Sequence, residues 1–415
     1  MLASTSNDVA FLAIAALVVL IVHPIGVIVE SLVVTVLRPR HGAHAGLRDR
    51  TSLASVSPPA VMISAALANE EHVLPETLST LARDLPEASI VVVGNGESPP
   101  LLEKLADWTK SSNRHLFLYE DDSTSKAENL NFAFFEALDL GTALVLDADS
   151  RLIPSDRVST EQDAVIVQHP KVIRSESGSV LETMVSIETM YKHYFTYPRR
   201  ARLYGLAYFS GSGAFLDVTS LRRANLRFDR RAFVEDIDLA LRCILSNLRV
   251  EFDVDGPAVT ETAPPTWTAW VGQRRRWAAG WLQLSKKYTG PILRCKTLPL
   301  HVRAKWLYLL VYRRLLMPAA AVALTSALVF GAPPYLATIW IACLVGMTAL
   351  QVTQLVRAPR IRGGGPSEWG SALAVWAILG WAYVVGLYLI DVSVLIWPVR
   401  RWRPTPRLQS IRSLH

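Results

Sequence analysis

Two aspartates separated by a single residue follow an apolar run of strand length. Asp147 and Asp149 come directly after Ala143–Leu146. Carboxylates with this spacing can hold a hard divalent cation whose other coordination positions are open to phosphate oxygens, and such a cation neutralises a diphosphate leaving group. Aspartate is also a common turn residue, so the pair by itself is equally consistent with an ordinary turn.

A second group of carboxylates begins the helical pattern Leu239–Leu245. It contains Glu235, Asp236 and Asp238. The helix dipole favours acidic residues in a first turn, which is the ordinary explanation. The functional interpretation is that Asp236 acts as a general base and removes a proton from an attacking hydroxyl.

A basic and aromatic group precedes the late apolar part of the chain, with the sequence Gln273-Arg274-Arg275-Arg276-Trp277. One interpretation is a helix at the membrane surface, with basic side chains that snorkel and a Trp at the level of the lipid headgroups. As a binding site, Arg276 offers a planar fork to phosphate and Trp277 an aromatic face to a sugar ring.

The elements that position these groups form an alternating pattern between about residues 59 and 262. The predicted strands are Val61–Leu67, Ser89–Val93, Leu116–Tyr119 and Ala143–Leu146, and the predicted helices are Glu76–Arg83, Leu101–Lys110 and Lys126–Leu138. Such alternation predicts an α/β domain with a parallel sheet, which binds ligands at the carboxyl ends of its strands. Asp147 and Asp149 follow one of these ends.

The composition indicates a globular part joined to membrane helices. The chain has 415 residues, of which 51% are hydrophobic and 19% charged, and its three cysteines form no C-x-x-C pair, so no zinc site is predicted. Its apolar runs are Val9–Leu37, Leu315–Ala332, Tyr335–Val356 and Ser371–Trp397. Each approaches or exceeds the ~20 residues of a spanning helix. The first lacks a basic leader and a cleavage site, so we expect an uncleaved anchor.

The positive charge follows the membrane segments. The formal net charge is +7, and basic clusters at Arg38–Arg50, Arg357–Arg362 and Arg400–Arg412 lie beside apolar runs. This placement favours the positive-inside rule over nucleic-acid binding. It predicts a multi-pass plasma-membrane protein with a cytoplasmic globular domain. Three late spans would then place the carboxyl terminus outside, in conflict with its arginine-rich tail.

The predicted organisation has five parts. These are a membrane helix at 9–37, the globular domain at 60–262, interfacial amphipathic helices at 265–314, membrane helices at 315–397 and a basic tail at 398–415.

The order of the motifs resembles that of membrane-integrated family 2 glycosyltransferases, which include cellulose, chitin and hyaluronan synthases. The motifs are Asn69-Glu70, Lys126 to Asn131, Asp147-x-Asp149, Gly211-Ser212-Gly213-Ala214, Glu235-Asp236 and Gln273-x-x-Arg276-Trp277. The resemblance covers about residues 60–290. The arrangement of one early and about three late membrane helices is similar to that of the nodulation chitooligosaccharide synthase.

The resemblance implies a GT-A-like fold and a role for each matching residue. Asp147 and Asp149 match the acidic pair at the donor diphosphate and its Mg²⁺ or Mn²⁺, and Lys126 matches a lysine that contacts the donor phosphates. Asp236 matches the catalytic base, with Val234 in place of the usual Thr. The residues that match diphosphate and acceptor contacts are Gln273, Arg276, Trp277, Glu235, Ser212 and Gly213.

One motif departs from the family pattern. An acidic pair usually follows the second strand and contacts uracil, whereas this chain has Val93-Gly94-Asn95-Gly96-Glu97-Ser98. The Asn95 amide both donates and accepts hydrogen bonds, so it can still pair with a base. The departure leaves the nucleotide open.

The function implied by the resemblance is an inverting, processive transfer of sugar, with a UDP-sugar as the expected donor, to a growing polysaccharide that passes through the membrane helices. One alternative is a non-processive transferase that adds one sugar to a lipid. A second alternative is an inactive membrane scaffold. The sugar, the linkage and any partner subunit stay open at this stage.

Overall fold

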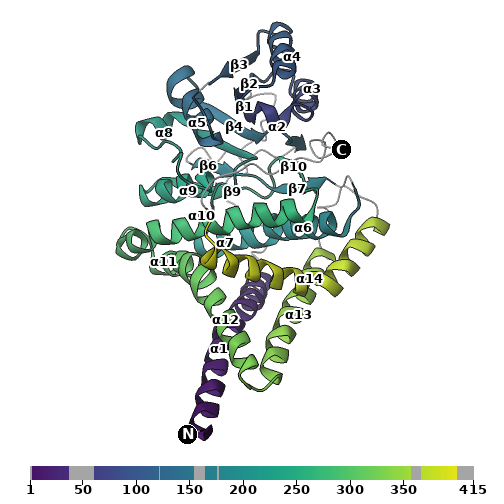
Figure 1. Ribbon diagram of the computed structural model, residues 1–415. Helices are drawn as coiled ribbons and strands as arrows, with labels where there is room; N and C mark the ends of the chain where they lie inside the picture. The colour runs from purple at the N-terminus through teal and green to yellow at the C-terminus, as the bar shows by residue number, and fades with distance from the viewer. Residues whose placement is uncertain are drawn as a thin grey trace. The chain divides into compact units, whose positions relative to one another are not determined.

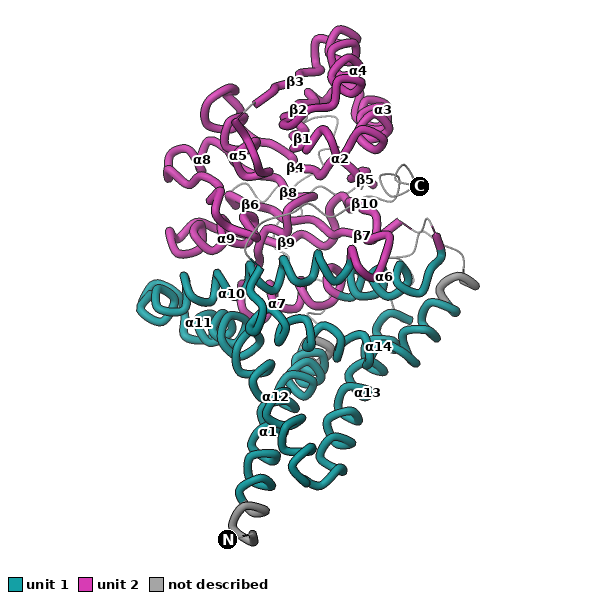
Figure 2. The backbone as a smooth tube through the Cα atoms, in the orientation of Figure 1, with its two compact units in different colours: residues 1–43, 178–191, 270–404 teal, residues 44–177, 192–269, 405–415 magenta. Residues whose placement is uncertain are grey.

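The structure is a computed structural model that describes residues 2–36, 60–120, 122–153, 164–174, 177–356 and 366–399. The basic clusters Arg38–Arg50, Arg357–Arg362 and Arg400–Arg412 lie outside these residues. The chain forms two compact units (Figure 2). The helical unit comprises residues 1–43, 178–191 and 270–404, and the sheet unit comprises residues 44–177, 192–269 and 405–415.

The sheet unit is built on a seven-stranded sheet with the order β3-β2-β1-β4-β8-β6-β9 (Figure 1). Its strands are β1 (Ala60–Ala66), β2 (Ile90–Asn95), β3 (His115–Tyr119), β4 (Thr142–Asp147), β6 (Ala164–Gln168), β8 (Ala214–Asp217) and β9 (Arg249–Phe252). Neighbouring strands are parallel except at β8, which is antiparallel to both β4 and β6. The predicted α/β fold is confirmed, and β8 makes its sheet mixed rather than wholly parallel.

The central strands are apolar on both faces, as buried parallel strands are. Leucines of α3 (Leu74–Asp84) and α4 (Pro99–Lys110) pack against residues of β1, β2 and β4 in one hydrophobic core. The other helices of the sheet unit are α2 (Leu67–Glu70), α5 (Lys126–Phe132), η1 (Ala133–Ala137), η2 (Lys192–Thr196), α7 (Tyr197–Tyr204), α8 (Val218–Arg223) and α9 (Glu235–Leu245). The predicted helix Lys126–Leu138 is therefore α5 continued by one π-helical turn, η1.

A second sheet has three strands in the order β5-β10-β7. They are β5 (Arg151–Ile153), β7 (Lys171–Arg174) and β10 (Ala258–Thr262). β10 runs antiparallel to β5 and parallel to β7. The sequence pattern did not predict this sheet, because its strands interrupt short apolar runs with charged or polar residues.

Within its described residues, the helical unit contains four helices that are long and apolar enough to span a membrane. These are Asp8–Val33, Leu300–Val329, Tyr335–Val356 and Gly370–Ile396. They confirm the expected pattern of one early and three late spans, which is typical of a multi-pass membrane protein. The elements of this unit are α1 (Leu2–Val36), α6 (Val180–Tyr191), α10 (Trp267–Arg294), α11 (Leu300–Leu307), η3 (Tyr308–Leu316), α12 (Met317–Val329), α13 (Tyr335–Val356) and α14 (Pro366–Ile396).

The second candidate span crosses the predicted boundary between interfacial and membrane helices. The sequence predicted interfacial helices up to residue 314 and membrane helices from residue 315, and these limits stay a prediction. In the structure α11, η3 and α12 are continuous from Leu300 to Val329. The polar residues before residue 315 are thus part of the same helix as the apolar ones.

Small residues let the first and later spans approach closely. Ala13 and Ala16 of α1 share a core with Ala320 and Ala327 of α12. Such residues are common where membrane helices pack, because little else drives apolar helices together in lipid.

A buried ion pair joins three helices of the helical unit. Arg274 of α10 donates to the Glu188 carboxylate of α6 at 2.5 Å, and the Tyr383 hydroxyl of α14 donates to the same carboxylate at 2.6 Å. Trp270 in turn donates its indole N–H to Tyr383 at 3.0 Å. Arg274 and Glu188 are each only 6% exposed, so neither charge is well solvated and each is stabilised by the other.

The variant Arg274→Met should therefore destabilise the fold strongly. Removing one partner of a buried ion pair leaves the other charge unpaired, which costs about 3–5 kcal/mol. The measurement is the thermal unfolding of the purified protein in detergent, with Arg294→Met as a control because Arg294 is exposed on the same helix. Equal unfolding temperatures for the two variants would contradict the prediction.

Candidate active site

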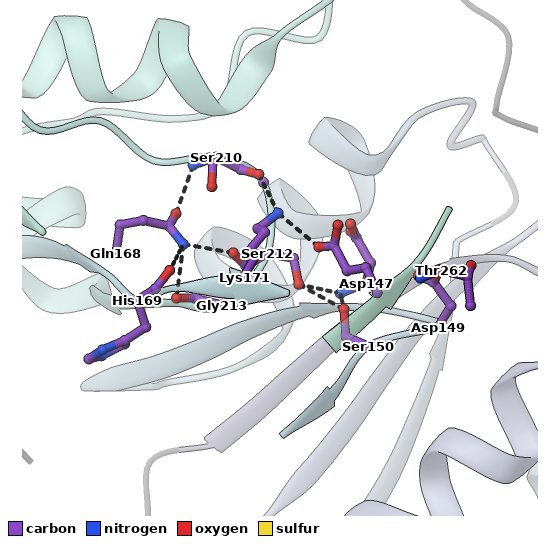
Figure 3. Close-up of polar contacts among 12 residues, drawn as sticks. Asp147, Asp149, Ser150, Gln168, His169, Lys171, Ser210, Ser212, Gly213 and Thr262 are labelled. Atoms are coloured by element: carbon purple, nitrogen blue, oxygen red, sulfur yellow. Dashed lines mark hydrogen bonds and ion pairs between the residues drawn. The ribbon is translucent and has the colours of Figure 1, made fainter. Parts of the chain in front are cut away.

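Asp147 and Asp149 lie where β4 ends, in the turn that leads to β5. The amide of Ser150 donates to the Asp147 carbonyl at 2.9 Å, which closes the turn. Asp149 is buried, and its carboxylate accepts the hydroxyl of Thr262, at the end of β10, at 2.8 Å (Figure 3). The short second sheet therefore fixes the second aspartate of the pair.

Lys126 stands at the first position of α5 and reaches the same strand end. Ser125 caps the helix by accepting the Glu128 amide, and the Glu128 carboxylate accepts the Thr124 amide in return, so the start of the helix is fixed. The Lys126 ammonium forms an ion pair with Asp147 and donates to the Gly211 carbonyl. Burial alone would lower the pKa of Lys126, but the neighbouring carboxylates, chiefly Asp147 and Glu235, raise it overall. The lysine is a cation at neutral pH.

The loop from Ser210 to Gly213 lies between the acidic groups. Gly211 has a φ of +89°, and a Cβ at this position would be 3.1 Å from a carboxylate oxygen of Asp236. Gly213 has a φ of +71°, and a Cβ there would be 2.8 Å from Val259. Both positions favour glycine for two reasons. The positive φ is unfavourable for other residues, and a Cβ would come too close to a neighbouring side chain.

Ser212 holds the first aspartate. Its hydroxyl accepts the Asp147 amide at 3.1 Å and lies 2.9 Å from the Ser150 hydroxyl (Figure 3). The sequence predicted an acceptor contact for Ser212, which stays a prediction. Since the side chain is fully buried, its observed contacts are within the protein.

Asp236 occupies the first turn of α9, and its carboxylate accepts the Ile237 amide at 2.8 Å. Burial raises the pKa of Asp236, while Lys126 and Lys171 limit that rise. A carboxyl group with a raised pKa is a stronger base once it is ionised. Asp236 thus lies beside Gly211 and within electrostatic reach of Lys126, which in turn contacts Asp147.

Lys171 of β7 is a site residue that the sequence did not single out. Its ammonium donates to the Ser210 carbonyl at 2.7 Å (Figure 3). The same ammonium pairs with Glu261 of β10 at 2.8 Å. Burial raises the pKa of Glu261, with Asp147 and Asp149 adding to the rise and Lys171 opposing it. The sequence offered one signal for Lys171 and Glu261: each is a charged residue within a short segment that also contains apolar residues. Lys126 and Lys171 hold consecutive carbonyls of the same loop.

Asn95 ends β2 and is already hydrogen-bonded within the protein. Its amide donates to the Ser123 carbonyl at 2.8 Å and accepts from Asn129 at 3.4 Å. Asn129, which is buried in α5, also donates to Ser64 of β1. The Asn95 side chain therefore links the predicted nucleotide loop to the start of α5.

Gln273, Arg276 and Trp277 belong to α10 in the helical unit. Trp277 is 36% exposed, and the Arg274 guanidinium lies 4.4 Å from the centre of its ring. Gln273 and Arg276 are partly exposed. The buried arginine of the motif is thus Arg274, which takes part in the ion pair with Glu188.

Two histidines of the sheet unit remain neutral. Burial lowers the pKa of His169 to about 4 and that of His193 well below its usual value. Both imidazole rings are therefore uncharged at neutral pH.

The carboxylates at the β4 end fit a hard cation with few protein ligands. Among the described residues no group of three or more His, Cys, Asp or Glu side chains could hold a metal by itself. Mg²⁺ and similar ions often take one or two carboxylates and complete their coordination with substrate phosphates and water. The two carboxylates of Asp147 and Asp149 match that donor set in type and number, and their role as metal ligands stays a prediction.

Comparison with known proteins decides the family. The model described as "Glycosyl transferase family group 2" matches residues 143–397, which is more than half of the chain. The chain belongs to this family. It is a glycosyltransferase, and the matched range includes Asp147, Asp236 and Trp277.

Individual relatives agree with this assignment. Over 106 residues the chain is 33% identical to glucomannan 4-beta-mannosyltransferase 1 of Cyamopsis tetragonoloba, a match that covers 26% of this chain and 20% of that enzyme. The mannosyltransferase PcManGT of Pyrobaculum calidifontis, solved with GDP-Man and Mn²⁺, aligns with a TM-score of 0.58 at 17% identity and covers 94% of this chain and 100% of its own. That likeness confirms the GT-A-like fold. The comparisons do not single out the cellulose, chitin and hyaluronan synthases within the family.

Lys171→Met should shift the pH dependence of the glycosyltransferase. The sequence predicts Asp236 as the base, and a base acts only when it is deprotonated, so activity should rise as pH rises through the pKa of Asp236. Loss of the Lys171 cation removes a charge that lowers the pKa of Asp236, so the acid limb of kcat/KM should move to higher pH. Lys171→Arg keeps the charge and should leave the limb near its original position. An acid limb that is the same in the Met variant and the wild type would contradict the prediction.

Proposed function

We propose that this glycosyltransferase moves a sugar from a nucleotide-sugar to a hydroxyl of a growing glycan, with inversion at the anomeric carbon and with Asp236 as the base. One observation carries the proposal. The Asp236 carboxylate lies against Gly211, whose carbonyl is held by the same lysine that pairs with Asp147. Lys126 thereby connects the proposed base, Asp236, with Asp147 of the proposed diphosphate-binding pair.

The proposed reaction is a single displacement. Asp236 accepts the proton of the acceptor hydroxyl while that oxygen attacks the anomeric carbon, and the nucleoside diphosphate leaves from the opposite face. Lys126 provides positive charge for the leaving phosphates. Asp147 and Asp149 would hold a Mg²⁺ or Mn²⁺ ion, which when bound supplies Lewis-acid stabilisation to the diphosphate.

The remaining predicted site residues have proposed roles in recognition. Arg276 and Gln273 contact the diphosphate and the acceptor end, and Trp277 stacks on a sugar of the glycan. The acceptor contacts also include Glu235, Ser212 and Gly213. Asn95 is proposed at the nucleobase, and both UDP- and GDP-sugars are candidate donors, since the matching mannosyltransferase was solved with GDP-Man.

The membrane placement is also part of the proposal. We place the protein in the plasma membrane with the sheet unit in the cytoplasm, because Arg38 to Arg50 follow the first span and basic residues favour the inner side. The domain limits given by the sequence belong to the same proposal. A cytoplasmic sheet unit would meet nucleotide-sugars where cells make them.

The variant Asp236→Asn tests the base. The amide keeps the size and most hydrogen bonds of the carboxylate but cannot accept the proton, so turnover should fall by about 100-fold or more. Donor binding should survive, which calorimetry with a nucleoside diphosphate can measure. If donor affinity collapses instead, Asp236 belongs to the donor site, and Glu235 or Asp238 becomes the candidate base.

The variants Trp277→Ala and Arg276→Ala test processive synthesis. Loss of the aromatic platform should shorten or abolish the polymer, while hydrolysis of the donor to free sugar persists because water is then the acceptor. Loss of Arg276 removes a charge-assisted contact to the diphosphate and should depress both reactions. The measurement pairs a product-size gel with nucleotide release for a panel of UDP- and GDP-sugars.

The wild-type product decides between the alternatives. A polymer supports the processive reaction, whereas a single sugar on a lipid supports the non-processive one. If no sugar of the panel releases nucleotide, the inactive-scaffold alternative is favoured. Normal product from both variants would show that the α10 motif is an ordinary basic helix.

A further inference from the structure

A group of polar side chains lies on the apolar spans of the helical unit and takes no part in the proposed transfer. It comprises His23 of α1, Tyr308, Tyr312 and Arg313 of η3, and Tyr388 of α14; we refer to these residues as the Arg313 cluster. Ionisable residues are rare within membrane helices and usually mark a functional site. The presence of these polar side chains on apolar spans therefore calls for an explanation.

Arg313 is held by a histidine rather than by a carboxylate. Its guanidinium lies 2.7 Å from Nε2 of His23, and Nδ1 of the same ring lies 2.6 Å from the Tyr308 hydroxyl. The ring of Tyr308 stacks on that of Tyr312, with centroids 4.9 Å apart. An arginine N–H needs an acceptor, so Nε2 of His23 carries no proton and the ring is neutral. Arg313 therefore donates to an uncharged partner.

The nearby acids are occupied by other cations. Arg314 contacts both carboxylate oxygens of Asp391, at 3.0 and 3.2 Å. Lys305 forms an ion pair with Glu30. Within the described residues Arg313 has electrostatic interactions with Asp391 but no ion pair of its own. The cluster carries a positive charge that no carboxylate neutralises directly.

Tyr388 supplies an independent observation. It is 4% exposed, and within the described part of the chain its hydroxyl has no hydrogen-bond partner. Its side chain packs in a core that Tyr312 also contacts, and it interacts electrostatically with Arg313 and Tyr308. A buried hydroxyl without a partner costs free energy, so such groups are uncommon unless a ligand completes them.

We propose that the Arg313 cluster binds the phosphate group of a membrane lipid. A guanidinium and an unpaired aromatic hydroxyl provide donors and positive charge, which suit a phosphate better than a neutral sugar. The cluster lies on the candidate membrane spans Asp8–Val33, Leu300–Val329 and Gly370–Ile396, where the phosphate-bearing molecules at hand are lipids. The site goes beyond the proposed transfer reaction and uses none of its residues.

The experiment measures thermal unfolding of the full-length protein in a neutral detergent with matched probes. The lipid probes are a polyprenyl phosphate against the corresponding polyprenol, and phosphatidic acid against diacylglycerol. Inorganic phosphate and a neutral oligosaccharide are added separately. A ligand that binds the folded state raises the unfolding temperature in proportion to its occupancy. We expect the phosphate-bearing lipid of at least one pair to stabilise the wild type, and its uncharged partner to have little effect.

Three variants assign the effect to the cluster. Arg313→Met should weaken the phosphate-lipid response by at least about 10-fold in apparent affinity, the size of one charge-assisted hydrogen bond. Tyr388→Phe should weaken it too, yet leave the ligand-free protein as stable as the wild type or more so, because it removes an unsatisfied hydroxyl. Arg294→Met changes an exposed arginine of the same unit and should leave the response unchanged.

The remaining outcomes overturn the proposal. Equal stabilisation by both members of each lipid pair, or an unchanged response in Arg313→Met and Tyr388→Phe, would show that the cluster is a structural network. Stabilisation by inorganic phosphate but by none of the lipids would show that the ligand is free phosphate and not a lipid. A response to the oligosaccharide that depends on Arg313 would replace the phosphate with a glycan. Stabilisation by nucleoside diphosphate, followed in the same samples, reports on the donor site and keeps failure of this proposal separate from failure of the proposed transfer.

Discussion

The interaction on which the sheet unit depends is the pairing of two partly buried carboxylates with two lysines. Asp147 and Glu261 lie close together, and each has a lysine partner, Lys126 and Lys171. Without those cations the negative charges would repel one another in a medium that screens them poorly. Both lysines also hold backbone carbonyls of the Ser210–Gly213 loop. Charge balance and loop geometry are thus maintained by the same two side chains.

This arrangement has a consequence for how a substrate is received. In the proposed reaction a diphosphate and its cation would bring both signs of charge into the site, so the lysines and carboxylates would exchange partners without losing all of them. Asp147 would then face a cation instead of Lys126, and Lys126 would face phosphate. An ion pair that is present before binding therefore keeps the site organised while its final partners are absent.

How far the sequence could predict this site depends on the length of each signal. The strand before Asp147 was predictable because a run of apolar residues ends at a carboxylate. Lys126 was found because its motif stands in the same order along the chain as in the family that the sequence resembles. Lys171 and Glu261 were missed because β7 and β10 mix charged and polar residues with the apolar ones, so they lack the continuous apolar run that marked the predicted strands. Their pairing is set by the second sheet, which is a tertiary feature. Similarly, the sequence analysis named Arg276 as a functional residue, whereas the buried arginine of α10 in the structure is Arg274. A sequence motif does not show which face of a helix is buried.

The wide turns of η3 give the second span a register of its own. In an α-helix each residue turns the chain by about 100°, so a nine-residue π segment from Tyr308 to Leu316 shifts the helix that precedes it relative to the one that follows. The adjacent residues Arg313 and Arg314 consequently reach different helices, one through His23 and the other through Asp391. A relative that differs here by a single inserted or deleted residue would keep the same hydropathy and the same number of spans. It would nevertheless present another side of the helix to its neighbours, so a one-residue gap in this segment carries more structural information than many substitutions.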